Sequence, residues 1–157
     1  MQKPASLRKA LTAALEELRK EPTRLAIWIE DGAVRSRDTG DLSFGFEYPL
    51  SVLLRDMKTD IALVTLAITR WLRVNQPDLL AGGPGDSFKF ETDILDNEKA
   101  DILITLQLRE AVKVTPIDGG GFDLEYQAEP DPLFEGDAGF EGTNAPQLQS
   151  VETIVAD

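Results

Sequence analysis

The sequence predicts an α+β fold, in which two main helices pack on a largely antiparallel β-sheet and a C-terminal extension follows. Two observations support this prediction. Two stretches carry apolar residues at helical spacing, and most of the remaining sequence up to residue 128 alternates between apolar and polar residues. At 157 residues, the chain is long enough for one domain with a substantial hydrophobic core.

The first helix is predicted to begin at Ser6, a natural N-cap residue, and to end before Pro22. Its apolar residues recur three and four positions apart, which places them on one face of a helix. These residues are Leu7, Ala10, Leu11, Ala14, Leu15 and Leu18.

The second helix, over residues 60–76, is apolar almost all the way round. Surface helices usually have a wider polar side, and a membrane span needs about 20 apolar residues without charges such as Arg70. We therefore expect this helix to contact protein on more than one side, with the sheet on one side and a neighbour on another. The polar stripe that would face the neighbour consists of Thr65, Thr69 and Arg73, and Gln76 extends it.

Residues 25–30 read as a strand, and the Asp31–Gly32 turn signal suggests 33–37 as its hairpin partner. Residues 42–54 alternate without interruption and form the clearest strand of the sequence. Because Pro49 cannot donate a backbone hydrogen bond, we expect an edge position or a bulge there.

Two further hairpins are predicted. Residues 88–94 pair with 102–109 across a polar turn, and the weaker segments 112–115 and 122–126 pair across a glycine turn. These elements complete a domain that we assign to residues 1–128.

Residues 129–157 form an acidic, Pro- and Gly-rich C-terminal arm of the sequence. Its few large apolar residues, including Phe134 and Phe140, are candidate docking points for a partner. All lysines and arginines lie at or before Lys113, so this end carries most of the formal net charge of −12. No basic face is evident, which argues against nucleic-acid binding.

The chain contains neither cysteine nor histidine, which removes the usual nucleophile–base pairs and the commonest zinc ligands. We expect no enzymatic activity, no cofactor and no metal site. The N-terminus has no apolar signal-peptide core, so the cytoplasm is the expected site of synthesis.

Four further groups of residues are candidates for a functional site. The loop 82–85 lacks the lysine and the spacing of a phosphate-binding loop, and the acids at Asp118, Asp123 and Glu125 lack a calcium-loop pattern. Asp93, Asp96 and Asp101 are best explained as solvated turn charges, although paired carboxylates also support acid–base catalysis. Arg35 and Arg37 read as exposed turn residues, with contact to an acidic partner as the alternative.

Two motifs resemble the tail completion protein R family of contractile-tailed phages. The first is Lys3-Pro4-x-Ser6-Leu7-Arg8-x-Ala10-Leu11, and the second, more specific one is Trp71-Leu72-Arg73-x-Asn75-Gln76-Pro77-Asp78. Ser43-Phe44 at the start of the long strand also fits, so that the resemblance covers roughly residues 3–110.

The resemblance implies a structural virion protein at the head-proximal end of a contractile tail. The order of the predicted elements is also similar to that of tail terminator proteins, which form hexameric rings. The expected partners are further copies of the chain, the tail tube protein, the tail sheath protein and head-side neck or connector proteins. DNA would pass through the ring without specific binding, and no membrane is involved.

Several alternatives stay open at this point. One is a tail assembly chaperone that leaves before the particle is finished, and another is a neck or collar protein of a phage-tail-like bacteriocin. A third is a small cell-wall enzyme that uses Asp93, Asp96 or Asp101.

Overall fold

The computed structural model describes residues 1–36 and 40–129, and these residues adopt the predicted α+β fold. Six antiparallel strands form one sheet: β1 (Leu25–Ile29), β2 (Ala33–Ser36), β3 (Phe44–Met57), β4 (Lys89–Ile94), β5 (Ala100–Pro116) and β6 (Phe122–Tyr126). The helices are α1 (Lys3–Ala14), α2 (Glu16–Lys20) and α3 (Ile61–Asn75), with short 3₁₀ turns at Pro22–Arg24 and Pro77–Leu80.

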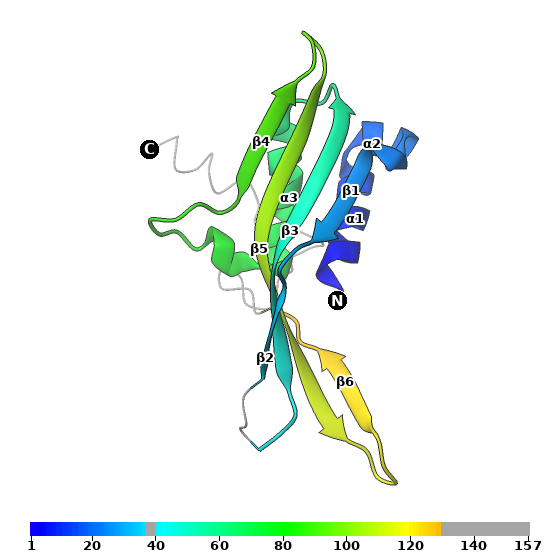
Figure 1. The fold of residues 1–157 in the computed structure, drawn as a ribbon, viewed down its shortest axis with the longest axis vertical. Coiled ribbons are helices and arrows are strands. Elements are labelled where there is room, and N and C mark those ends of the chain that lie inside the picture. The colour runs from blue at the N-terminus through cyan, green and yellow to red at the C-terminus, as the bar shows by residue number, and fades with distance from the viewer. Residues whose placement is uncertain (37–39, 130–157) are drawn as a thin grey trace, which may run out of the picture.

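The two longest strands, β3 and β5, run side by side through the whole sheet (Figure 1). At one end they are flanked by β1 and β4, in the order β1-β3-β5-β4, and we call this part the body. At the other end β2 pairs with residues 44–47 of β3, and β6 pairs with residues 112–116 of β5. We call this second part the hairpin arm.

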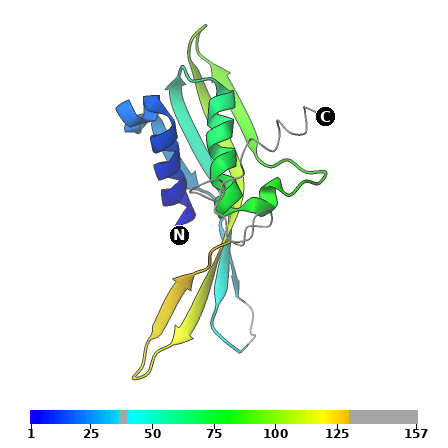
Figure 2. The same cartoon turned by 180° about the vertical axis from the view of Figure 1, so that it is seen from behind.

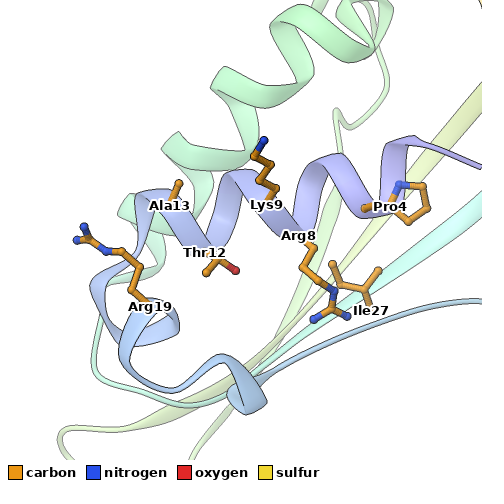
Figure 3. A pocket seen from close by; sticks show the side chains of 8 residues that line it. Pro4, Arg8, Lys9, Thr12, Ala13, Arg19 and Ile27 are labelled. Carbon is orange, nitrogen blue, oxygen red and sulfur yellow. The ribbon is translucent and has the colours of Figure 1, made fainter.

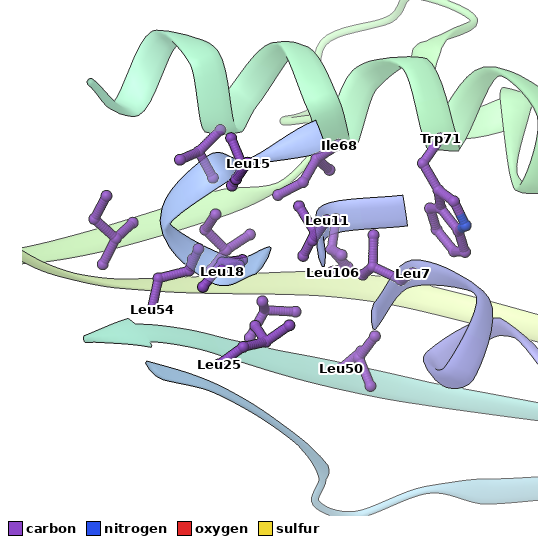
Figure 4. Close-up of a cluster of buried hydrophobic side chains, with 14 of the residues drawn as sticks. Leu7, Leu11, Leu15, Leu18, Leu25, Leu50, Leu54, Ile68, Trp71 and Leu106 are labelled. Carbon is purple, nitrogen blue, oxygen red and sulfur yellow. The ribbon is translucent and has the colours of Figure 1, made fainter. Parts of the chain in front are cut away.

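The helices α1 and α3 lie on the same face of the body, as the view from behind shows (Figure 2). Between them and the sheet lies one hydrophobic core (Figure 4). Each layer contributes fully buried leucine, isoleucine or valine side chains, because the apolar positions of the helices and of β3 and β5 face one another. The core includes Leu7, Leu11 and Leu18, then Leu50, Val52 and Leu54, then Val64, Ile68 and Leu72, and finally Ile104 and Leu106.

The start of the first helix was predicted wrongly. The helix begins at Lys3 with Gln2 as its N-cap, since a proline fits the first turn of a helix, where no N–H donor is needed. Ser6 lies inside the helix, and its hydroxyl accepts a hydrogen bond from Trp71 Nε1 at 3.0 Å. The helix also breaks at Leu15, whose extended backbone separates α1 from α2.

The pairing of the second strand was also predicted wrongly. β2 pairs with β3 rather than with β1, so that β1 and β2 lie end to end along the same side of β3. Asp31, between them, has a φ of 54°, a left-handed conformation that interrupts a strand.

Pro49 lies in a central strand, not at an edge, because β3 pairs with β5 across it. On the other side, β1 reaches only to Leu50 and β2 begins at Glu47. Pro49 therefore lies opposite the break between β1 and β2, where the neighbouring ladder is interrupted and a missing donor costs little. The register shift in β3 occurs instead between Leu54 and Met57.

The helix over residues 60–76 is confirmed, and so are the two later hairpins, 88–94 with 102–109 and 112–115 with 122–126. Asp60 is the N-cap of α3, and its carboxylate accepts a hydrogen bond from Ala62 N at 2.7 Å. The segments 102–109 and 112–115, predicted as separate strands, form the single strand β5. No helix among the described residues is long and apolar enough to cross a membrane.

Candidate functional site

The outward side of α3 carries exposed leucines, although the solvent-facing side of a surface helix is usually polar. Leu63 and Leu66 are 55 % and 54 % exposed, and Val64, Ile68 and Leu72 are buried on the opposite side. We call the exposed surface around Ala62, Leu63, Leu66 and Arg70 the helix face.

The residues of the predicted polar stripe differ in exposure. Thr65 is exposed, whereas Thr69 and Arg73 are half-buried, and Gln76 is buried. Their role in contacts with a neighbour stays a prediction. The sequence pattern predicted the helix and its wide apolar surface correctly, and the structure shows that Leu63 and Leu66 lie on its exposed side.

The two sequence motifs meet at the junction between the body and the hairpin arm. Lys3 Nζ donates hydrogen bonds to Gln76 Oε1 at 3.0 Å and to the carbonyl of Arg109 at 2.6 Å. The amide of Gln76 in turn donates to the carbonyl of Gln107 and accepts from Arg109 N. These contacts tie the start of α1 and the end of α3 to β5, so the motifs mainly support the fold.

Glu110 is the central group of this junction and is only 5 % exposed. Its carboxylate accepts hydrogen bonds from Gln2 N, Lys3 N and Tyr48 Oη, at 2.7 to 3.1 Å. A carboxylate at the N-terminus of a helix is favourable because the first N–H groups lack partners within the helix. Sequence reasoning missed Glu110, whose only signal is an acid at an alternating position where apolar residues are expected.

The junction also changes the acidity of its neighbours. Burial and the bond to Glu110 raise the pKa of Tyr48 far above its ordinary value. Burial lowers the pKa of Lys3, and an ion pair with Glu129 at 3.1 Å opposes this shift. Because the carboxylate of Glu110 is already occupied by donors, the cluster is well suited to hold the structure together.

Two of the three acids considered as catalytic candidates, Asp96 and Asp101, accept backbone hydrogen bonds. Asp96 accepts hydrogen bonds from the backbone N–H groups of Glu98 and Lys99, and these bonds lower its pKa. Asp101 accepts from Asp56 N at 2.8 Å. Asp93 lies opposite Asp101 in the β4–β5 ladder. Within residues 1–36 and 40–129 no group of three potential ligands is suited to a metal ion.

The other candidate contact residues are only partly described. Arg35 lies on β2 and forms an exposed ion pair with Glu47 at 2.7 Å, which is consistent with a solvated cross-strand pair. Arg37, Phe134 and Phe140 lie outside the described residues, as does nearly all of the C-terminal segment predicted from residue 129 onward.

An open groove between α1 and β1 carries basic side chains (Figure 3). Arg8, Lys9 and Arg19 line it together with Ile27, and Arg8 donates to the carbonyl of Leu25 at 3.3 Å. The other lining residues of the groove are Pro4, Ala5, Thr12 and Ala13.

The hairpin arm carries a second group of exposed apolar side chains. Phe122 and Leu124 on β6 are 52 % and 57 % exposed, and Val34 on β2 is 65 % exposed. Large exposed apolar patches usually mark interaction sites in soluble proteins. The described residues therefore offer surfaces for assembly.

Comparison with known proteins identifies the protein family to which the chain belongs. The model of the family described as P2 phage tail completion protein R (GpR) matches residues 1–130. The chain therefore belongs to this family of phage tail completion proteins.

A named relative agrees with this assignment. The chain is 37 % identical over 134 residues to the tail completion protein R of Escherichia phage P2, and the match covers 84 % of this chain and 86 % of the relative. No solved structure matches the chain.

Proposed function

We propose that this protein completes a contractile phage tail as a structural, non-enzymatic component that forms a ring on top of the tail tube. The sheath would adjoin the ring, and the head-side neck or connector proteins would attach to it. Family membership supports the role in tail completion. The observation that carries the ring is the outward apolar side of α3, with Leu63 and Leu66 more than half exposed.

Several physical features suit such a ring. A repeated contact between two different surfaces of identical chains forms a closed ring when the rotation between neighbours closes. The acidic charge of the chain favours passage of DNA without specific binding. A hexamer is the expected state, and the C-terminal segment from residue 129 would reach neighbouring proteins with its acids and its few apolar residues.

The test measures the mass of the assembled protein and its location on the phage particle. Native mass spectrometry of the full chain should give a defined multiple of 17.3 kDa, and negative-stain microscopy should show rings. Immunogold labelling of purified particles should then mark the head-proximal end of the tail. A chain that stays monomeric at high concentration and is absent from finished tails contradicts the proposal.

The same particles separate this role from that of an assembly chaperone. A chaperone would be needed for tail formation but missing from finished particles, whereas a completion protein should be present in a fixed ratio to the tube protein. Mass spectrometry of purified tails measures this ratio directly.

A further inference from the structure

Among the exposed apolar residues of the described chain, two groups lie on different parts of the molecule. One is the helix face of α3, around Leu63 and Leu66. The other is one face of the hairpin arm, which we call the arm face. The strand pairings define it, because residues directly opposite each other in an antiparallel pair point to the same side.

The arm face continues the core side of the sheet beyond the helices. On β3 and β5 the inward positions of the body, such as Leu50 and Leu106, are followed at even spacing by Phe44 and Val112, which pair with each other. Val112 then pairs with Tyr126, Val114 with Leu124, and Pro116 with Phe122. The apolar side therefore extends to the tip of the arm, where Phe122 and Leu124 are more than half exposed.

The arm face cannot be covered by α3 of the same chain. β3 and β5 are paired from the arm into the body, with partners from Phe44–Val112 through to Leu54–Ile102. This continuous ladder holds the arm away from the helices, and both views show it projecting beyond them (Figures 1 and 2). Val112 and Val114 are already buried in the single chain, whereas no described element of the chain covers Phe122 and Leu124 at the tip, and these two side chains are available to another molecule.

Charge points to a second copy of this chain as that molecule. The hairpin formed by the end of β5, its turn and β6 carries Asp118, Asp123 and Glu125 against a single base, Lys113. The charged residue of the helix face is Arg70, which is exposed. Asp123 and Glu125 alternate with the apolar residues of β6 and therefore project from the opposite side of the same hairpin. The hairpin as a whole is nevertheless acidic and the helix face is basic, so the two parts attract each other.

We propose that the arm face of one copy packs on the helix face of the next copy. This inference rests on the proposed ring and names the contact that builds it. Each copy offers one arm face and one helix face, so every contact is heterologous and leaves one surface free at each end until the ring closes.

One substitution on each surface tests the contact. Leu66→Asp changes the helix face and Leu124→Asp changes the arm face; both side chains are more than half exposed, so the fold should be retained. A carboxylate placed at the centre of an apolar contact has to lose its water on association, which should weaken association by about 100-fold or more. Native mass spectrometry should find each variant as a single chain under conditions in which the original chain assembles.

Mixing the two variants gives the decisive measurement. The Leu66→Asp variant keeps an intact arm face, and the Leu124→Asp variant keeps an intact helix face. A one-to-one mixture can therefore form one contact and then stops, so it should yield a pair of chains and nothing larger.

The matched control is Gln107→Asp on β5, which is exposed on the side of the sheet away from the helices because it alternates with the buried Leu106 and Leu108. It should assemble as the original chain does, and circular dichroism should show the same fold for all variants. Assembly of either single variant at the original affinity overturns the proposal, as does a mixture that stays monomeric. In both cases the ring itself stands if the original chain still forms it, whereas a monomeric original chain overturns the proposed ring as well.

Discussion

The body and the hairpin arm are built from the same two strands, yet they differ in what covers them. In the body, the apolar side of β3 and β5 is closed by α1 and α3, so that Leu50 and Leu106 are fully buried. In the arm, the same alternation continues past the ends of the helices, and Leu124 on the neighbouring strand is 57 % exposed. One sequence pattern therefore serves folding in one region and offers a contact surface in the other.

The largest expected difference comes from matched leucine truncations. Leu106→Ala in the body should lower the free energy of unfolding by about 2–5 kcal/mol, because it leaves a cavity in a closed core. Leu124→Ala in the arm should change it by about 0.5 kcal/mol or less, because that side chain is already exposed in the single chain. Urea unfolding at a concentration at which the chain is monomeric measures both, and equal losses would contradict the division into body and arm.

The junction between the two regions gives the next largest effect. Glu110→Gln removes the charge that accepts hydrogen bonds from two backbone N–H groups and from Tyr48, and should cost about 1–3 kcal/mol of stability. The exposed Glu125 in the arm is the matched control, and Glu125→Gln should leave stability nearly unchanged. If both substitutions have the same small effect, the junction does not hold the arm to the body.

A pH titration extends the comparison to the far end of the body. Partial burial opposes ionisation of Glu17, but hydrogen bonds from Thr59 and Lys58 prevail and hold its pKa below the ordinary 4.5. A lowered folded pKa adds stability above the unfolded value and loses it as the pH falls below about 4.5. Thermal unfolding between pH 6 and 3 should therefore show a loss in the original chain that is smaller in Glu17→Gln. The expected difference is about 1 kcal/mol or less, and identical pH profiles would contradict it.

The smallest effect is expected at the ion pair on the polar side of the arm. Arg35 and Glu47 are both well exposed, so solvent screens their attraction. Arg35→Ala should leave the melting temperature unchanged within error. A clear loss of assembly without a loss of stability would instead identify Arg35 as a contact residue, as the sequence suggested.

Local sequence signals were sufficient to predict the position of most individual helices and strands. Asp60 and Pro77 bracket α3 because one accepts a backbone hydrogen bond and the other ends the helix. The alternation in residues 42–54 and 102–109 predicted the central strands, since a period of two places one side of a strand on the core. The motifs around Lys3 and Trp71–Asp78 predicted the family, which the comparisons confirmed.

The sequence thus determined which segments form helices and strands and to which family the chain belongs. Only the tertiary structure decided that β2 pairs with β3 rather than β1, that Lys3 meets Gln76, and that Glu110 is buried at the junction. It also decided which apolar positions remain open, such as Leu66 and Leu124. The sequence and the tertiary structure determine different features for a physical reason. Periodicity fixes the direction of a side chain relative to its own backbone, whereas its burial depends on which distant segment packs against it.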